Sequence, residues 1–262
     1  MPELPEVETV VRTVAPFVTG RTIQQAEFTS RFVTPGNRKL LASRLEGRRI
    51  ESVRRRGKFI VMALDKGTLT VHLGMTGRLL AQGEPGPHTY GLFTLDEGQL
   101  LYTDPRQFGK IEWSAGPPPR IARLGPEPLE IGFEEFRAKL RKRGGMKALL
   151  LNQTFLAGLG NIYADESLFA AGIHPLASAA RLSAPRAAKL HQTIQEILGE
   201  AIALGGSSIS DYVDANGERG WFQIQHKAYG REGEPCVQCG RPIRKILVAQ
   251  RGTHFCPKCQ KR

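Results

Sequence analysis

Hydrophobic residues near the start of the chain recur at steps of three and four positions. This periodicity is typical of a helix that buries one face, and it spans residues 5–17. Gly20 lies just beyond, at a position suited to the end of a helix. The residues that would share the buried face are Val7, Val10, Val11, Val14 and Phe17.

The pattern then changes to short runs of β-branched and aromatic residues separated by glycine-rich breaks. Such runs are typical of strands. We therefore expect a strand-rich domain that begins with one helix. The expected strands cover residues 21–32, 49–56, 58–65, 68–73, 77–82, 90–95, 99–103 and 109–113.

A second change follows the proline-rich stretches 116–119 and 125–128, which should break any regular element. Helical periodicity dominates after them. The expected helices cover residues 133–143, 145–155, 161–171 and 185–203. Residues 205–230 are rich in Gly, Ser, Asp and Asn, and so long a loop in a compact domain is usually functional or disordered.

These changes divide the chain into four expected parts: a strand-rich domain at 1–118, a linker at 119–132, a helical domain at 133–230 and a cysteine-containing module at 231–262. No apolar run approaches the roughly 18 residues of a membrane span. The acidic, proline-broken N-terminus resembles neither a secretory signal nor a transit peptide. We therefore expect a protein of the cytosol that does not associate with membranes.

Charge points to a polyanionic partner. The 262 residues include 37 Lys and Arg against 25 Asp and Glu, a net charge of +12, while 40 % hydrophobic residues suffice for packed cores. Basic residues cluster at 54–58 and 141–143, and residues 231–262 contain eight of them against two acids. A solvated face explains any one cluster, but three on so basic a chain favour a nucleic acid as partner.

All four cysteines lie near the C-terminus, in two Cys-x-x-Cys pairs separated by 16 residues. This spacing is typical of a tetrahedral four-cysteine zinc site with a β-hairpin between the pairs. Two disulfides are the alternative, but no feature indicates secretion, and a redox Cys-x-x-Cys would need a βαβ context. The expected ligands of one structural zinc ion are Cys236, Cys239, Cys256 and Cys259.

The opening Pro2-Glu3-Leu4-Pro5-Glu6-Val7-Glu8-Thr9-Val10 resembles that of the formamidopyrimidine-DNA glycosylase family, also called Fpg or MutM. Further matches follow in order along the whole chain. They are the Arg-Gly-Lys-Phe turn that contains Lys58, His72-Leu73-Gly74-Met75, the intercalation loop Asp104-Pro105-Arg106-Gln107-Phe108-Gly109, the Gly158–Ala164 turn, the Tyr229–Cys236 segment and the finger tip Gln250-Arg251-Gly252-Thr253.

The resemblance implies an α+β chain of two domains with DNA held between them. The N-terminal domain would be a β-sandwich that begins with a helix. The C-terminal domain would combine a helix-two-turn-helix motif with the four-cysteine zinc-finger β-hairpin. The loop 205–230 would cover the everted base, and the protein would act as a monomer on damaged double-stranded DNA.

The resemblance also implies the chemistry at the N-terminus. Removal of Met1 would leave Pro2 with a free secondary amine, which is nucleophilic when neutral. That amine would attack the sugar and form a Schiff base, after which the strand is cut by β- and δ-elimination. Glu3 would donate the proton that opens the sugar ring, provided that its pKa is raised. Glu6 would satisfy backbone donors near the helix start and Glu8 would face solvent.

Two basic residues complete the implied catalytic set. Lys58 resembles the family lysine that donates a proton in β-elimination and contacts the lesion's phosphate, although a turn lysine on a basic surface is the plain alternative. Arg251 resembles the residue that binds phosphate and assists δ-elimination. Because a guanidinium stays protonated near pH 7, phosphate binding is the role that its chemistry supports directly.

The remaining implied contacts hold the DNA and fill the gap left by the extruded base. Arg106 would bond to the widowed cytosine, Phe108 would wedge between bases, and Met75 would be the third filler. The positions that match DNA-contacting residues are His72, His88, Lys147 and Asn161. Each has a plain structural alternative, such as a core methionine or a packing turn.

The chain also departs from the family pattern. Gln107 stands where many relatives have a basic residue, Tyr90 where histidine is common, and Asn152 in place of an aspartate. None is the expected nucleophile, so we expect these changes to affect affinity more than chemistry.

The leading interpretation is a bifunctional glycosylase and abasic-site lyase for 8-oxoguanine and formamidopyrimidines in base excision repair. The endonuclease VIII type, which prefers oxidised pyrimidines, is the second enzyme class. A catalytically silent zinc-dependent DNA-binding protein is the third possibility, but it would lack Pro2, Glu3 or Lys58, and all three are present.

Overall fold

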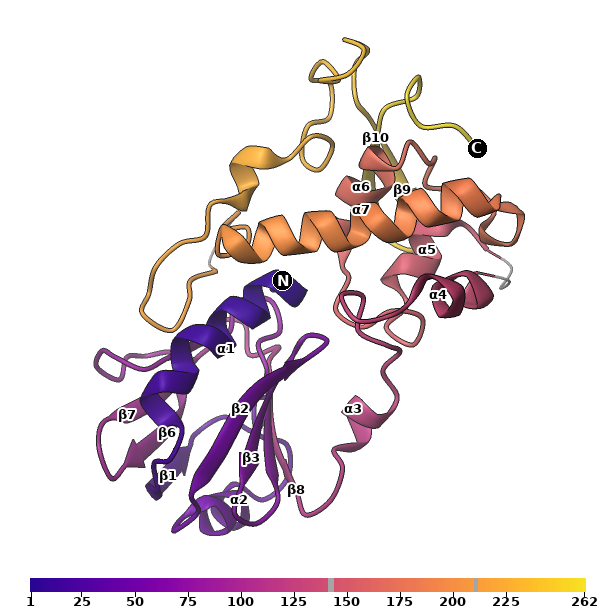
Figure 1. Cartoon of the computed structure of the whole chain (residues 1–262). Helices are drawn as coiled ribbons and strands as arrows, with labels where there is room; N and C mark the ends of the chain where they lie inside the picture. The colour runs from indigo at the N-terminus through magenta and orange to yellow at the C-terminus, as the bar shows by residue number, and fades with distance from the viewer. Residues whose placement is uncertain (141–143, 210–211) are drawn as a thin grey trace. The chain divides into compact units, whose positions relative to one another are not determined.

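The computed structural model describes residues 1–140, 144–209 and 212–262, which form two compact units (Figure 1). Unit 1 comprises Met1–Arg123 together with Leu204–Gln223. Unit 2 comprises Leu124–Ala203 together with Ile224–Arg262. The two-domain α+β fold expected from the sequence is confirmed.

Unit 1 begins with the helix α1, Leu4–Val18. Its apolar residues at steps of three and four are buried, as the periodicity predicts, although Phe17 stays 41 % exposed. Pro5 occupies the first turn, where the missing N–H breaks no helical hydrogen bond.

Two antiparallel four-stranded sheets follow α1. The first has the order β1-β6-β7-β5, with β1 at Ile23–Phe28, β5 at Arg78–Leu80, β6 at Thr89–Leu95 and β7 at Gln99–Thr103. The second has the order β2-β3-β4-β8, with β2 at Ile50–Arg56, β3 at Phe59–Leu64, β4 at Thr68–His72 and β8 at Lys110–Ser114.

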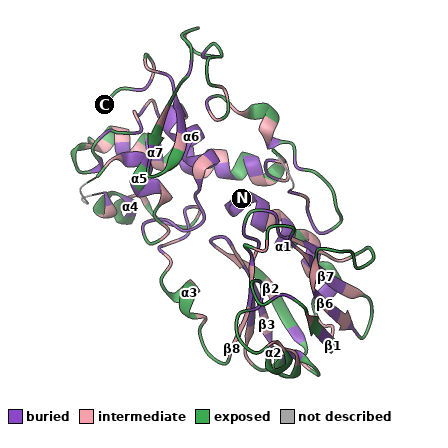
Figure 2. Cartoon of the chain, turned by 180° about the vertical axis from the view of Figure 1, so that it is seen from behind, coloured by how far each residue is buried: buried purple, intermediate pink, exposed green. Residues whose placement is uncertain are grey.

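One hydrophobic core joins α1 to both sheets, and Figure 2 shows the buried residues of these elements in purple. Val10 of α1, Phe93 of β6 and Met62 of β3 are all within 1 % of complete burial. The eight predicted strands are present, most of them with shifted ends.

Two short helices were not expected. Helix α2, Arg38–Leu45, buries only Leu45, so it leaves no periodic apolar pattern, and Asn37 caps it by accepting from Leu40 N at 3.1 Å. Helix α3, Pro119–Ala122, lies in the stretch expected to contain no regular element. That expectation was wrong because proline is favourable in the first turn of a helix.

Unit 2 contains the expected helices: α4 at Phe133–Lys139, α5 at Met146–Leu151, α6 at Asn161–Ala170 and α7 at Ala184–Ala203. Single 3-10 turns lie at Ala179–Arg181 and at Phe222–Gln225, the latter at the boundary with unit 1. The basic cluster 141–143 and the predicted end of α4 lie outside the described residues.

The hairpin of the cysteine module has the expected form. Strand β9, Arg244–Val248, pairs with β10, Arg251–Phe255, in antiparallel register. Within the described part of the chain, no helix has the length and apolar character needed to span a membrane.

The long loop is divided between the units. The sequence placed 205–230 wholly with the helices, but residues 204–223 group with unit 1, where Tyr212 and Ala215 join its core. These two apolar side chains attach the segment to unit 1. The sequence did not predict this attachment, because the composition around them is rich in Gly and Ser.

Candidate active site and zinc centre

The segment before α1 is buried although it starts the chain. Pro2 is buried and Glu3 is only 3 % exposed, whereas Met1 is 46 % exposed. The peptide N–H of Glu3 donates to Oε2 of Glu6 at 2.7 Å. The first turn of α1 therefore holds Pro2 and Glu3 in fixed positions within unit 1.

Four charged side chains act on the amino group at the N-terminus. Burial is the main cause of the lowered pKa of the Met1 amino group; the carboxylates of Glu3 and Glu6 oppose it, and Lys58 and Arg106 reinforce it. Because charge interactions fade with distance and screening, these four groups lie near the N-terminus. The net lowering increases the neutral, nucleophilic fraction of an amine at this place.

Glu6 connects the start of α1 to residues 204–223. Its Oε2 accepts from Glu3 N and its Oε1 accepts from Ser207 N, both at 2.7 Å. A Cβ at Gly206, where φ is +80°, would lie 2.8 Å from Glu6 Oε1, so only glycine permits this approach. The expectation that Glu6 satisfies backbone donors is confirmed.

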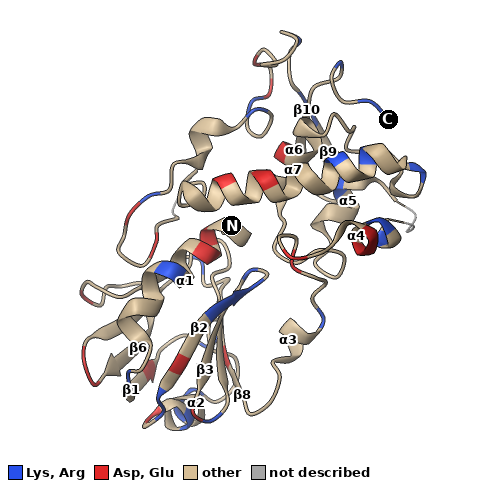
Figure 3. Ribbon diagram, viewed as in Figure 1, with Lys and Arg blue, Asp and Glu red and all other residues tan. Residues whose placement is uncertain are grey.

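The turn between β2 and β3 presents Lys58, which is 7 % exposed. Figure 3 shows the basic stretch at the end of β2 that leads into this turn. Arg55 in that stretch donates to Glu8 at 2.9 Å, and Glu8 also pairs with Arg12 at 2.8 Å. The expectation of a solvent-facing Glu8 was wrong, because its carboxylate ties β2 to α1.

His72, at the end of β4, is a neutral donor. Burial, followed by the positive charge of Lys58, lowers the pKa of His72 to about 4. Its Nδ1 accepts from Gly74 N at 3.1 Å, so the neutral ring carries its proton on Nε2. The ring of Phe59 packs against it with centroids 4.9 Å apart. His72 can therefore donate one hydrogen bond without a charge.

A buried carboxylate organises the loop 104–109. Asp104 is 0 % exposed, and its carboxylate accepts from Thr76 Oγ1 at 2.5 Å, Gly109 N at 2.8 Å and Tyr102 OH at 3.3 Å. Burial and this carboxylate raise the pKa of Tyr102, so its hydroxyl keeps its proton. Thr76 Oγ1 in turn accepts from Arg106 N at 3.2 Å.

The two side chains expected to enter DNA project from this loop. Phe108 is 52 % exposed, and the Arg106 guanidinium lies 4.7 Å from the centre of its ring. Gln107 between them has φ +54°, which turns the backbone sharply. An exposed aromatic ring beside a guanidinium has the composition needed to enter a base stack.

Met75 lies on a neighbouring turn and is 39 % exposed. A Cβ at Gly74 would lie 2.4 Å from Gly109 N, so the turn and the loop are in close contact. The turn that carries Met75 therefore packs against the loop that carries Arg106 and Phe108. His88 is exposed, and its carbonyl accepts from Asp104 N at 3.0 Å.

In unit 2, Asn161 opens α6 and contacts the hairpin. Its Nδ2 donates to Gly252 O at 3.0 Å, and its buried Oδ1 has no partner among the described residues. Arg251 is exposed and directly follows the turn Ala249–Gln250, whose φ values are +48° and +59°. Two such positive values are typical of a tight type I′ hairpin, here without the usual glycine.

Lys147 is not placed for direct contact with DNA. Its side chain is 0 % exposed, and its Nζ binds Asp165 Oδ1 at 2.6 Å. The surface role expected from the sequence is therefore corrected: a lysine with no exposed surface and a buried carboxylate partner does not reach a phosphate in this arrangement. No sequence pattern indicated Asp165 as its partner.

The four cysteines converge as their spacing predicts. All four Sγ atoms lie within 4.8 Å of one another, with Cys236 to Cys259 at 3.9 Å and Cys239 to Cys256 at 3.5 Å. Thiolates bound tetrahedrally to zinc at about 2.3 Å lie about 3.8 Å apart. All four are free thiols rather than disulfides, so the set fits one zinc ion.

Comparison with known proteins agrees with this geometry. Residues 1–111 match the model of the formamidopyrimidine-DNA glycosylase N-terminal domain, 124–213 match the formamidopyrimidine-DNA glycosylase H2TH domain, and 233–262 match a zinc finger found in FPG and IleRS. The chain belongs to the formamidopyrimidine-DNA glycosylase family. The family resemblance expected from the sequence motifs is confirmed.

Several family members match over their full length. A formamidopyrimidine-DNA glycosylase from Solibacter usitatus is 57 % identical over 265 residues, covering 100 % of both chains. The crystal structure of the MutM (Fpg) protein from Thermus thermophilus is 45 % identical with a TM-score of 0.90, covering 99 % of this chain and 98 % of that one. A Lactococcus lactis Fpg mutant in complex with a Fapy-dG containing DNA is 40 % identical with a TM-score of 0.91, covering 100 % of both chains.

The zinc-finger match and the cysteine geometry together confirm the expected structural zinc site. Four thiolates close its coordination shell, as in structural rather than catalytic zinc sites. The ion would supply folding energy to a hairpin too small to bury a core of its own.

The three residues expected to depart from the family pattern each contact other parts of the protein. The side chain of Gln107 accepts from Ser30 Oγ at 2.6 Å, and Tyr90 packs against the core of unit 1. Asn152 Oδ1 accepts from the backbone N–H and the hydroxyl of Thr154, both at 2.9 Å. Each residue has thus acquired a partner within the protein.

Proposed function

We propose that this chain is a bifunctional DNA glycosylase and abasic-site lyase that removes oxidised purines from duplex DNA in base excision repair. The observation that carries the proposal is the buried Pro2–Glu3 segment, held by α1, with Lys58 acting on the same N-terminus. Relatives with 40 % identity were solved in complexes with DNA that contains Fapy-dG or an abasic site, which supports damaged DNA as substrate.

The first step uses Pro2. Once Met1 has been removed, the neutral nitrogen of Pro2 forms a bond to C1′ of the damaged nucleotide. The bond from C1′ to the base breaks, and the base leaves with its electron pair and takes up the proton that the Pro2 nitrogen releases. Glu3, next in the chain, donates a proton to O4′ as the C1′–O4′ bond breaks and the sugar ring opens. The product is an iminium ion between Pro2 and C1′.

The iminium ion then withdraws electrons from the sugar. In β-elimination, C2′ loses a proton and the 3′ phosphate leaves. In δ-elimination, C4′ loses a proton and the 5′ phosphate leaves. Lys58 donates a proton in β-elimination and contacts the lesion's phosphate, and Arg251 holds a phosphate during δ-elimination. The low exposure of Lys58 strengthens such contacts by excluding water.

The described contacts also support extrusion of the damaged base. Phe108 and Met75 would fill the vacated space while Arg106 bonds to the base opposite. His72, His88 and Asn161 would hold phosphates, with His72 donating from Nε2. In this proposal the protein acts on DNA as a monomer.

Borohydride trapping on a duplex that contains 8-oxoguanine tests this proposal. Reduction of the iminium ion should give a covalent complex of protein and DNA, and Pro2→Gly should abolish or strongly weaken it. A duplex that contains thymine glycol separates the purine preference from the endonuclease VIII type. Absence of any adduct with the Met1-processed enzyme on either lesion would contradict the proposed chemistry.

A further inference from the structure

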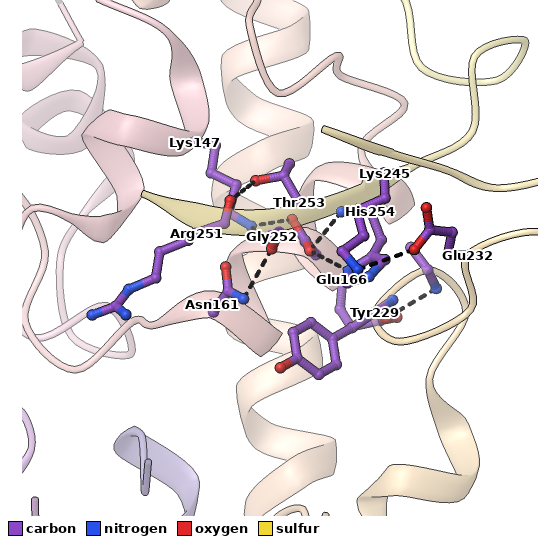
Figure 4. Close-up of polar contacts among 12 residues, drawn as sticks. Lys147, Asn161, Glu166, Tyr229, Glu232, Lys245, Arg251, Gly252, Thr253 and His254 are labelled. Atoms are coloured by element: carbon purple, nitrogen blue, oxygen red, sulfur yellow. Dashed lines mark hydrogen bonds and ion pairs between the residues drawn. The ribbon is translucent and has the colours of Figure 1, made fainter. Parts of the chain in front are cut away.

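Two adjacent carboxylates on α6 are buried, although neither belongs to the proposed reaction. Asp165 is 1 % exposed and Glu166 is 3 % exposed. Glu166 accepts from the backbone N–H groups of residues 227, 228 and 229 at 2.9, 2.9 and 2.7 Å. Glu166 therefore holds the segment that leads into the zinc finger (Figure 4). Asp165 binds a different part of unit 2.

Asp165 binds both a lysine and the backbone of β10. Its Oδ1 lies 2.6 Å from Nζ of Lys147, and its Oδ2 accepts from His254 N at 2.9 Å. The ring Nδ1 of His254 lies 3.3 Å from the same Oδ2. The lysine reaches further to Gly252 O at 3.4 Å, where Asn161 Nδ2 also donates at 3.0 Å.

These contacts lie along one edge of β10. Successive peptide groups of a strand point to opposite sides, so Gly252 and His254 share an edge. Arg251 pairs with Val248 of β9 on the other edge. The outer edge of a two-stranded hairpin has no neighbouring strand to bond its backbone groups. Here side chains from α5 and α6 form hydrogen bonds with those backbone groups instead.

Arg251 immediately precedes this anchored edge. It follows Ala249 and Gln250, which both have positive φ without being glycine. A strained turn persists only when the surrounding structure determines it. Figure 4 shows the Arg251 side chain extending away from the cluster formed by Lys147, Gly252 and His254. Gly252 and His254 are thus anchored positions directly after Arg251 in β10.

We propose that Asp165 is a positioning residue that, through Lys147 and His254, fixes the outer edge of β10 and so directs Arg251. This inference rests on the proposed function, in which Arg251 holds a phosphate during δ-elimination. It also gives Lys147 a role: the lysine acts through Asp165 and Gly252 rather than on DNA.

The test must separate positioning from loss of stability. Removing one member of a buried ion pair leaves an uncompensated charge and can unfold the protein, whereas removing both charges is far milder. The informative variant is therefore Lys147→Met combined with Asp165→Asn, which keeps the side-chain shapes. Glu166→Gln is the matched control, because it weakens the hold of the same helix on residues 227–229 without removing a contact to β10.

The measurement is the ratio of β- to δ-elimination product on a duplex with a single abasic site, together with borohydride trapping and zinc content. We expect the double variant to retain one zinc and trapping within about twofold of the wild type, while its β-product fraction rises several-fold. Glu166→Gln should leave that fraction unchanged. A wild-type product ratio in the double variant, or an equal shift in Glu166→Gln, would overturn the inference.

Asp165→Glu supplies a second variant should the double variant not fold. It keeps the charge but displaces the carboxylate by one methylene group, and it should also raise the β-product fraction; an unchanged ratio in a zinc-loaded Asp165→Glu protein would overturn the inference. Failure of the proposed function has a different signature, since the wild-type protein itself would then give no trapped adduct.

Discussion

Ser30 donates its hydroxyl hydrogen to the side-chain oxygen of Gln107 at 2.6 Å, across 77 positions of sequence. Ser30 Oγ also accepts from the N–H groups of Phe32 and Val33 at 3.1 and 3.2 Å. One buried hydroxyl thus joins the turn after β1 to the residue between Arg106 and Phe108. Gln107, which the sequence comparison by motif marked as a departure, is thus held within its loop by Ser30.

Ser30→Ala tests this connection. It removes the acceptor of two backbone N–H groups and the donor to Gln107, so the free energy of unfolding should fall by about 2–3 kcal/mol. Gln107→Ala is the control; it removes one of these bonds and should cost about 1 kcal/mol. Chemical denaturation measures both, and equal losses in the two variants would contradict the central place given to Ser30.

Asp104→Ala should disrupt the loop that presents Arg106 and Phe108. It leaves the Gly109 N–H and the Tyr102 hydroxyl without their buried acceptor, so we expect a loss of about 3 kcal/mol. Affinity for a duplex with an abasic site should fall as well. Denaturation and a binding titration check the two effects, and wild-type values in both would show that the loop does not depend on Asp104.

Stability should depend on pH through His72. Its pKa is about 4 in the folded chain against 6.5 when unfolded, so the unfolded chain binds more protons between these values. The free energy of unfolding therefore falls as pH decreases from about 6.5 to 4, by up to about 3 kcal/mol from this residue. His72→Gln should flatten the curve in that window, and an unchanged slope would contradict a buried neutral His72. His226, whose pKa burial also lowers to about 4, should keep part of the slope in the variant.

Removal of zinc should unfold the finger and leave unit 1 intact. Without the ion, the four thiolates lose their common partner. The hairpin β9–β10 has only a small core, which cannot hold the finger folded by itself. A chelator should release one zinc per chain and abolish DNA binding. A thiol-reactive dye follows the release of zinc through the thiols that it frees, and a binding assay follows the loss of DNA affinity. Full DNA affinity in the metal-free protein would exclude this role of the finger.

The sequence predicts much of this fold because local periodicity reports burial. Helix α1 and the strands of both sheets have buried positions at the expected spacing. Helix α2 was missed because seven of its eight residues stay at least partly exposed. The finger was predicted by its cysteines, since a metal site requires a specific spacing of ligands.

The sequence did not predict the contacts between residues that are far apart along the chain. Asp165 lies 18 positions from Lys147 and 89 from His254, and no local pattern links them. Residues 104–109 were matched to the family's intercalation loop, but the three groups that donate to Asp104 come from separate strands and loops. The carboxylate of Glu6 contacts Ser207 across 201 positions and holds the first part of the long loop within unit 1.

The central claim is that the N-terminal amine performs the chemistry. Mass spectrometry of the borohydride-trapped adduct, after digestion with a protease, tests it most directly. We expect the DNA remnant on the nitrogen of Pro2, in a peptide that has lost Met1. A remnant on Lys58, or an adduct on chains that retain Met1, would contradict this account.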